Sequence, residues 1–171
     1  MFIKEKYAWA IILLLLFFSA CGYRFAGSGS LPSGITSISV KMFKNRSAET
    51  GVENIITNDL IYEFIRHEQE VLTGKDKADA VLTGVIVSIS SRTISHKGEY
   101  TSNERRVEFK VDLQLTDKSG VVIWSAKNVS DNEAYKVSST KQVTERNKKV
   151  AIKKLSKRLA ESIYNSLTAD F

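Results

Sequence analysis

The chain is poor in the residues that cross-link proteins or bind metals. Its 171 residues include one cysteine, Cys21, one proline, Pro32, and two histidines, His67 and His96. A single cysteine cannot form a disulfide within the chain, so packing alone must hold the fold together. The two histidines follow no metal-ligand spacing. We therefore expect neither a metal site nor a cofactor.

Sequence patterns of catalysis are missing as well. The chain has no H-E-x-x-H or G-x-S-x-G pattern, and the Gly-Ser stretch at 27–30 lacks the lysine and following helix of a phosphate-binding loop. Catalysis needs several converging chemical groups, and the sequence supplies few. We expect no enzyme. An accessory domain with a small-ligand pocket is an alternative that no sequence feature requires.

No apolar run is long enough for a membrane-spanning helix, which needs roughly 20 apolar residues. The longest run, Ala8–Cys21, is preceded by Lys4 and Lys6 and ends in small residues. A charged head, an apolar middle and a small-residue end are typical of an export signal. We therefore predict that residues 1–20 are a signal peptide that is removed.

The end of this signal resembles the lipobox of bacterial lipoproteins, in which the cysteine thiol is joined to diacylglycerol and the new N-terminus is acylated. The residues are Phe18-Ser19-Ala20-Cys21, with Phe18 where the lipobox usually has Leu. Several acyl chains on Cys21 would anchor the protein firmly. Gly22, where an Asp often retains lipoproteins at the inner membrane, favours the outer membrane. The alternative is a plain secretory signal followed by a free thiol.

The remaining chain is the size of one domain. Removing residues 1–20 from 171 leaves 151 residues and lowers the net charge from +6 to +5. We expect a lipidated N-terminus and Gly- and Ser-rich linker over 21–34, and one domain over 35–171. The basic excess favours anionic partners. We expect no nucleic-acid partner, because the export signal removes the domain from the cytoplasm.

The first half of the domain is predicted to form a strand, a helix and a second strand. Ile35–Phe43 alternates apolar and polar residues, as in a strand with one buried face. A helix is predicted from Val52, after a capping box of Thr50 and Glu53. Its apolar positions recur every three or four residues: Ile55, Ile56, Leu60, Phe64 and Ile65. Its outer side is expected to carry Asn54, Asn58, Asp59 and Glu63.

The next strand, Ala78–Ser90, has apolar residues on both faces, which suggests an interior strand. We expect its main buried face to carry Val81, Val85, Val87 and Ile89, with Leu82 and Ile86 partly loading the other. Two connections stay open. Glu68–Leu72 could extend the helix or form a short extended piece, and 90–103 could be a long hairpin connection or a strand extension.

The second half contains the clearest strand, Arg106–Thr116, whose apolar and polar residues alternate without a break. A turn at Asp117–Gly120 leads into a fourth strand, Val121–Val129, that could continue through 131–137. A long helix is predicted from the capping pair Ser139 and Gln142 to about Leu167. Its expected buried stripe is Val143, Val150, Ala151, Leu155, Leu159, Ile163 and Leu167.

These elements predict an α+β fold of the order β-α-β-β-β-α. We expect a two-layer sandwich in which a four-stranded, mostly antiparallel sheet carries two helices packed on one face.

The order of several short segments resembles the LptE family of lipopolysaccharide-assembly lipoproteins. Its members share a C-G-Y start, an F-x-N segment after the first strand and an A-D-x-x-L-x-G-like segment. The corresponding residues here are Cys21-Gly22-Tyr23, Phe43-Lys44-Asn45 and Ala78–Gly84, with Gly51-Val52-Glu53 at the start of the helix. The resemblance covers essentially the whole mature chain.

This resemblance implies an outer-membrane lipoprotein of a Gram-negative bacterium, lipid-anchored on the periplasmic side. It implies a plug inside the β-barrel translocon LptD that helps the barrel assemble and helps lipopolysaccharide reach the outer leaflet. The alternative is another outer-membrane lipoprotein adaptor, such as a peptidoglycan-synthase activator or a secretion subunit.

Lipopolysaccharide carries phosphates, which attract Lys and Arg. Basic residues around one predicted hairpin are our candidate lipopolysaccharide contacts: Arg92, Lys97, Arg105, Arg106 and Lys110. The alternative is a solvated strand end. The basic face of the last helix is either solvated surface or a contact with acidic loops of the barrel.

Overall fold

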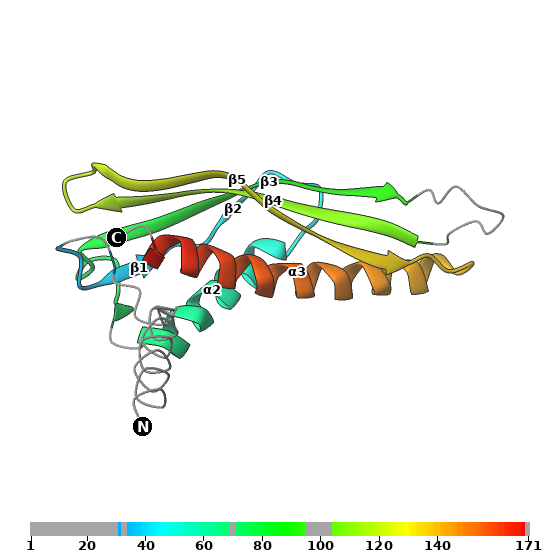
Figure 1. The fold of residues 1–171 in the computed structure, drawn as a ribbon, viewed down its shortest axis with the longest axis horizontal. Helices are drawn as coiled ribbons and strands as arrows, with labels where there is room; N and C mark the ends of the chain where they lie inside the picture. The colour runs from blue at the N-terminus through cyan, green and yellow to red at the C-terminus, as the bar shows by residue number, and fades with distance from the viewer. Residues whose placement is uncertain (1–30, 32–33, 69–70, 95–103, 170–171) are drawn as a thin grey trace, which may run out of the picture.

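The computed structural model describes residues 31, 34–68, 71–94 and 104–169. Two helices lie on one face of a single sheet, which confirms the predicted α+β sandwich (Figure 1). Cys21, His96 and Lys97 lie outside the described residues, as does the predicted signal peptide. The elements in chain order are β1 (Ile38–Val40), β2 (Lys44–Asn45), α2 (Val52–Glu68), β3 (Ala80–Thr93), β4 (Glu104–Asp117), β5 (Val122–Lys136) and α3 (Lys141–Ala169).

The sheet is mixed and has one strand more than predicted. Its order is β1-β3-β4-β5, and β2 pairs with β3 beyond β1. Both short strands run parallel to β3, whereas β3, β4 and β5 form an antiparallel meander. The predicted strand Ile35–Phe43 is therefore an interrupted edge, and α2 is the crossover that makes this edge parallel.

The interruption of the edge comes from Phe43, which leaves the strand to enter the core. Its N–H donates to Thr57 Oγ1 of α2 at 3.1 Å, and its side chain is only 2% exposed. The ring lies directly on Gly84 of β3, where a Cβ would be 2.4–2.5 Å from three ring atoms. A glycine is needed at this position because the aromatic ring occupies the space of a side chain.

The loop between β2 and α2 is held by Asn45. The Asn45 amide donates to Glu53 Oε2 at 2.8 Å and to the Glu49 carbonyl at 2.7 Å, and its oxygen accepts from the N–H and hydroxyl of Ser47. Hydrogen bonds from its own backbone N–H and from Asn45 lower the pKa of Glu53. Glu53 thus lies at the helix start with Asn45 as its side-chain partner, and the described residues show no hydrogen bond between Glu53 and Thr50, the predicted capping pair.

The prediction of which α2 residues face outward is partly wrong, because α2 packs against α3 as well as the sheet. Glu63 is buried, and its Oε2 lies 2.8 Å from Arg66 Nη2 without hydrogen-bond alignment. Asp59 Oδ2 accepts from the Ser156 hydroxyl of α3 at 2.5 Å. Ile65, predicted to be buried, is 46% exposed.

The two faces of β3 are also the reverse of the prediction. The fully buried side is Ala80, Leu82, Gly84 and Ile86, while Val81 and Val85 are half-buried on the other face. A bulge between Ile86 and Ser88 then returns Ile89 to the core side, opposite Phe109. Alternation could not decide the orientation because both faces of this strand are apolar.

Where the structure describes the open connections, they continue the strands, and residues 95–103 of the predicted hairpin lie outside the described residues. β3 continues to Thr93 and β4 begins at Glu104, so the hairpin strands pass beyond the predicted core segment. β5 continues to Lys136, and its Trp124 faces the core. α2 ends at Glu68, after which Leu72 forms a single parallel bridge with Ile38.

Helix α3 is anchored along its length but has a more exposed N-terminal half than predicted. The C-terminal half lies beside α2, whereas the N-terminal half runs on alone over the sheet (Figure 1). Val150, predicted to be buried, is 51% exposed. The other predicted stripe residues from Ala151 onward are buried, and Ile152, Ala160 and Tyr164 join them on the side that meets α2.

We expect Gly84→Ala to lower the free energy of unfolding by about 1–3 kcal/mol, because the added methyl overpacks the Phe43 ring. Urea denaturation measures this loss. The control, Gly74→Ala, introduces a Cβ with no atom within 4 Å and should leave the stability nearly unchanged. In the Gly84→Ala background, Phe43→Leu should cost less than it does alone; additive losses would contradict the contact.

Candidate functional site: the open face of the sheet

The face of the sheet that the two helices leave uncovered carries the charged residues of β4. Since Val107, Phe109 and Val111 are buried under the helices, their neighbours Arg106, Glu108 and Lys110 project from the open face. Strand pairing places Arg92 of β3 opposite Arg106, and Asn132 of β5 opposite Glu108. The site is thus assembled from all three long strands.

The structure brings three of the five predicted lipopolysaccharide contacts onto this face. Arg92, Arg106 and Lys110 share it, while Arg105 lies on the helix-facing side of β4, in register with Tyr135. Arg105 is nevertheless exposed, because it lies near the end of the strand. Lys97 lies outside the described residues.

A shallow depression of about 210 Å³ on the open face is lined by Arg92, Arg106, Glu108 and Asn132. Arg92 Nη2 lies 3.9 Å from Glu108 Oε2, a weak surface ion pair. Two guanidinium groups and the nearby Lys110 therefore face one carboxylate within this cluster. Such an open, basic surface can hold an anionic group by charge-assisted hydrogen bonds but does not enclose a substrate.

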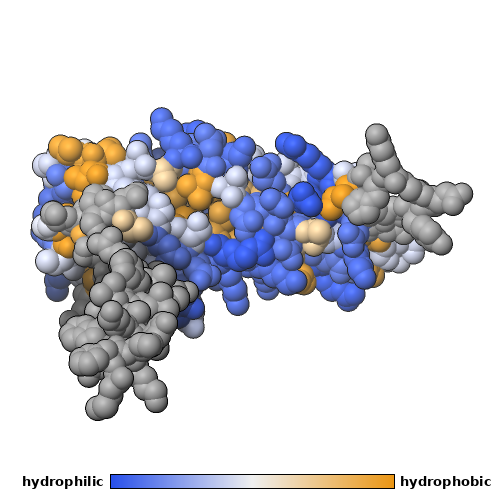
Figure 2. All heavy atoms as spheres, viewed as in Figure 1, coloured by the Kyte–Doolittle hydropathy of each residue, from blue (hydrophilic) through white to orange (hydrophobic). Residues whose placement is uncertain are grey.

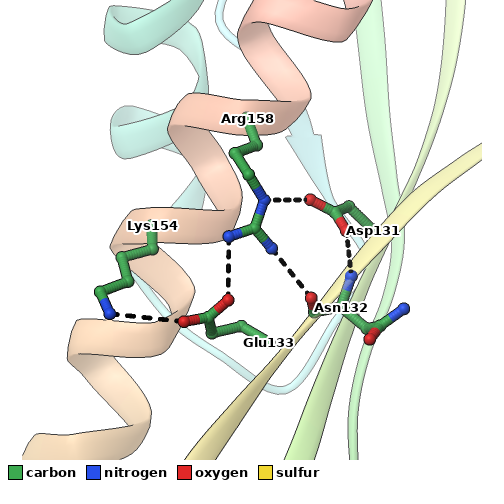
Figure 3. A network of polar contacts seen from close by, with 5 residues as sticks. All are labelled: Asp131, Asn132, Glu133, Lys154 and Arg158. Atoms are coloured by element: carbon green, nitrogen blue, oxygen red, sulfur yellow. Dashed lines mark hydrogen bonds and ion pairs between the residues drawn. The ribbon is translucent and has the colours of Figure 1, made fainter.

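The helix-facing side of β5 carries a second polar network, which binds α3 to the sheet (Figure 3). Arg158 of α3 donates to Asp131 Oδ2 at 2.6 Å, to Glu133 Oε2 at 2.9 Å and to the Asn132 carbonyl at 2.9 Å. Lys154 donates to Glu133 Oε1 at 3.4 Å. The hydrogen bond from Arg158 lowers the pKa of Glu133, and Asp131 and Glu133 raise the pKa of Arg158.

This network positions the open-face site from behind. Arg158 holds the backbone of Asn132, whose side chain lines the depression on the other side of the strand. In Figure 3 the Asn132 side chain points away from the guanidinium. The sequence did not indicate this role, because Asp131 and Glu133 lie in a segment whose strand character was left open.

The described residues contain no group of three or more His, Cys, Asp or Glu side chains that could hold a metal ion. Within the same part of the chain, no helix combines the length and apolarity needed to cross a bilayer.

The model of the LptE family, described as lipopolysaccharide-assembly, matches residues 35–167. The chain belongs to the LptE family. It is thus a lipoprotein of lipopolysaccharide assembly, a role that is not enzymatic. No curated protein sequence matches the chain.

Solved structures of bacterial lipoproteins share the fold of this LptE-family chain. Lipoprotein B from Nitrosomonas europaea is 15% identical, with a TM-score of 0.58 over 81% of this chain and 84% of that one. A minor lipoprotein from Acinetobacter baumannii is 17% identical, with a TM-score of 0.56 over 81% and 95%. The rare lipoprotein B from Shewanella oneidensis is 15% identical, with a TM-score of 0.53 over 77% and 95%.

The short LptE-like segments make contacts that connect different elements of the fold. Phe43 packs on Gly84, and Asn45 holds the start of α2. Asp79 Oδ2 accepts from the N–H and hydroxyl groups of Thr36 and Ser37 at 2.7–3.1 Å, and its Oδ1 accepts from Lys118 Nζ at 2.8 Å.

Asp79 thus joins the segment before β1 to the turn between β4 and β5. Hydrogen bonds from Lys118, then from Thr36 and Ser37, hold the pKa of the Asp79 carboxyl well below its ordinary value of 3.8.

The depressed pKa predicts acid sensitivity. Charged Asp79 stabilises the fold above its unfolded pKa, near 3.8, and this contribution is lost as the pH falls toward the lower folded pKa. In urea denaturation from pH 7 to pH 2, Asp79→Asn should be less stable than wild type at neutral pH and should lose less stability below about pH 4. The matched variant of an exposed neighbour, Asp76→Asn, should follow the wild-type curve; equal behaviour of both variants would contradict the prediction.

Proposed function

We propose that this LptE-family chain is an outer-membrane lipoprotein, lipid-anchored through Cys21 on the periplasmic side of a Gram-negative outer membrane. It forms a plug in the lumen of an LptD-like β-barrel, helps that barrel assemble and helps insert lipopolysaccharide into the outer leaflet. The family match over residues 35–167 is the observation that carries the proposal.

The distribution of polarity supports a place inside a barrel. Most of the apolar residues of the sheet and helices are buried against each other in one core. Its uncovered sheet face presents arginine, lysine, glutamate and glutamine side chains along β4. The interior wall of a large outer-membrane barrel is polar, and this face is chemically compatible with it.

The open-face cluster supports contact with lipopolysaccharide. Guanidinium groups bind phosphate through paired hydrogen bonds, and Arg92 and Arg106 lie opposite each other across two strands. Lys110 adds a further positive charge on the same face. These three residues, with Lys97, are the proposed contacts for phosphate or sugar groups. Arg105 lies on the opposite face of β4, so it tests whether binding depends on the open face.

We expect the full-length protein, extracted from membranes in mild detergent, to co-purify with one large β-barrel protein. Mass spectrometry identifies the partner and the acyl groups on Cys21. Recovery of a peptidoglycan synthase, or of a ring of identical subunits, would support a different adaptor role. An unmodified Cys21 would contradict the anchor.

Charge reversal separates the two faces of β4. Arg106→Glu should weaken lipopolysaccharide binding by about tenfold or more, the effect of losing one charge-assisted hydrogen-bonding group. Arg105→Glu changes the net charge equally, one residue away, on the opposite face, and should bind nearly as wild type. Binding of labelled lipopolysaccharide to the intact protein measures both, and equal losses would contradict a role for the open face.

A further inference from the structure

The positive charge of the protein is concentrated on one element. Helix α3 has eight basic and two acidic residues, whereas the whole chain has 25 basic and 19 acidic residues. The rest of the chain therefore carries 17 residues of each sign. All of the net charge of +6 belongs to α3.

Part of this charge is neutralised within the fold. Lys148 pairs with Glu49, and Lys154 and Arg158 pair with acidic residues of β5. The other five basic side chains of α3 form no ion pair within the described part of the chain: Lys141, Arg146, Lys149, Lys153 and Lys157.

Four of these side chains form a straight line on the outside of the helix. Arg146, Lys149, Lys153 and Lys157 follow at intervals of three and four residues, and all are exposed. We call these four residues the α3 stripe. At a rise of about 1.5 Å per residue the stripe is roughly 16 Å long. The surface over α3 is largely hydrophilic (Figure 2). Val150, which follows Lys149 of the stripe in the helix, is 51% exposed.

The composition of the α3 stripe favours a lipid surface over a protein partner. Protein interfaces are enriched in aromatic residues and arginine and depleted in lysine, and their strongest contacts are Trp, Tyr and Arg. The stripe has three lysines, one arginine and no aromatic residue. Rows of lysine are instead typical of segments that adsorb to anionic phospholipid headgroups, where contacts need no fixed geometry.

We propose that, while the tethered domain is outside a barrel, its α3 stripe docks on anionic phospholipid headgroups of the leaflet that holds the lipid tether. The inference rests on the tether at Cys21 but not on the barrel. The fourteen residues from Cys21 to Gly34 span at most about 48 Å, enough for the domain to lie on its helical side. In this orientation the open sheet face, with Arg92 and Arg106, points away from the lipid surface.

A fluorescent label on the helix tests this docking. The full-length lipidated protein, with acylation of Cys21 verified by mass, carries Val150→Cys with an environment-sensitive dye and is reconstituted into vesicles. We expect blue-shifted emission in phosphatidylglycerol vesicles and not in phosphatidylcholine vesicles. At 1 M salt, where screening acts within about 3 Å, the shift should disappear. A label at Gln114→Cys, on the open sheet face, should show no shift in either lipid.

Charge reversal in the stripe provides the matched comparison. Lys149→Glu with Lys153→Glu should reduce docking about tenfold or more, because each basic residue near the surface adds attraction. Lys75→Glu with Lys77→Glu makes the same change in net charge at exposed residues of a turn and should dock as wild type. Equal emission in both lipids, or equal loss in both variants, would overturn the proposal.

Binding to the barrel is measured separately, by co-purification. If the stripe variant docks normally but no longer co-purifies with the barrel, the stripe is a protein-binding surface and the lipid proposal is wrong. If wild type docks on phosphatidylglycerol without recovering a barrel, the plug proposal fails and the docking proposal stands.

Discussion

The packing of the Phe43 ring on the bare backbone of Gly84 is the contact on which the arrangement of the domain depends. It draws the edge of the sheet inward and connects that edge to α2 through Thr57. The parallel edge and the crossover helix are thereby fixed to the antiparallel meander. Asp79 makes a second joint at the end of the sheet, between Ser37 and Lys118. These contacts give the LptE-like sequence segments a structural role.

The sandwich separates packing from binding. One side of the sheet is buried beneath α2 and α3, and the other side is free to display charge (Figure 1). Arg158 connects the two sides, because it holds the backbone of the strand whose Asn132 lines the open-face depression. A change on the helix side of β5 can therefore alter the geometry of the open face without touching a ligand.

Charge is divided in the same manner. Ion pairs such as Arg158 with Glu133 connect one element of the fold to another. The charges in these pairs already have partners within the fold. The α3 stripe and the open-face arginines lie on opposite sides of the domain, where both are available to external anions. A tethered protein with two such surfaces can engage a lipid surface with one and lipopolysaccharide with the other.

The amino-acid sequence by itself determined the elements, the fold class and the family, since alternation along β4 and the three-to-four spacing of apolar residues in both helices are local properties. It could not decide which face of β3 is buried, because Val81 and Leu82 are both apolar and only the position of the helices distinguishes them. Nor could it predict that Glu63 is buried, because α3 covers that flank of α2 from far along the chain. Likewise, the sequence does not distinguish Arg105 from Arg106, because both are arginines at the start of the same strand. The tertiary structure assigns them to opposite faces, because the pleat alternates side chains and the helices cover only one side.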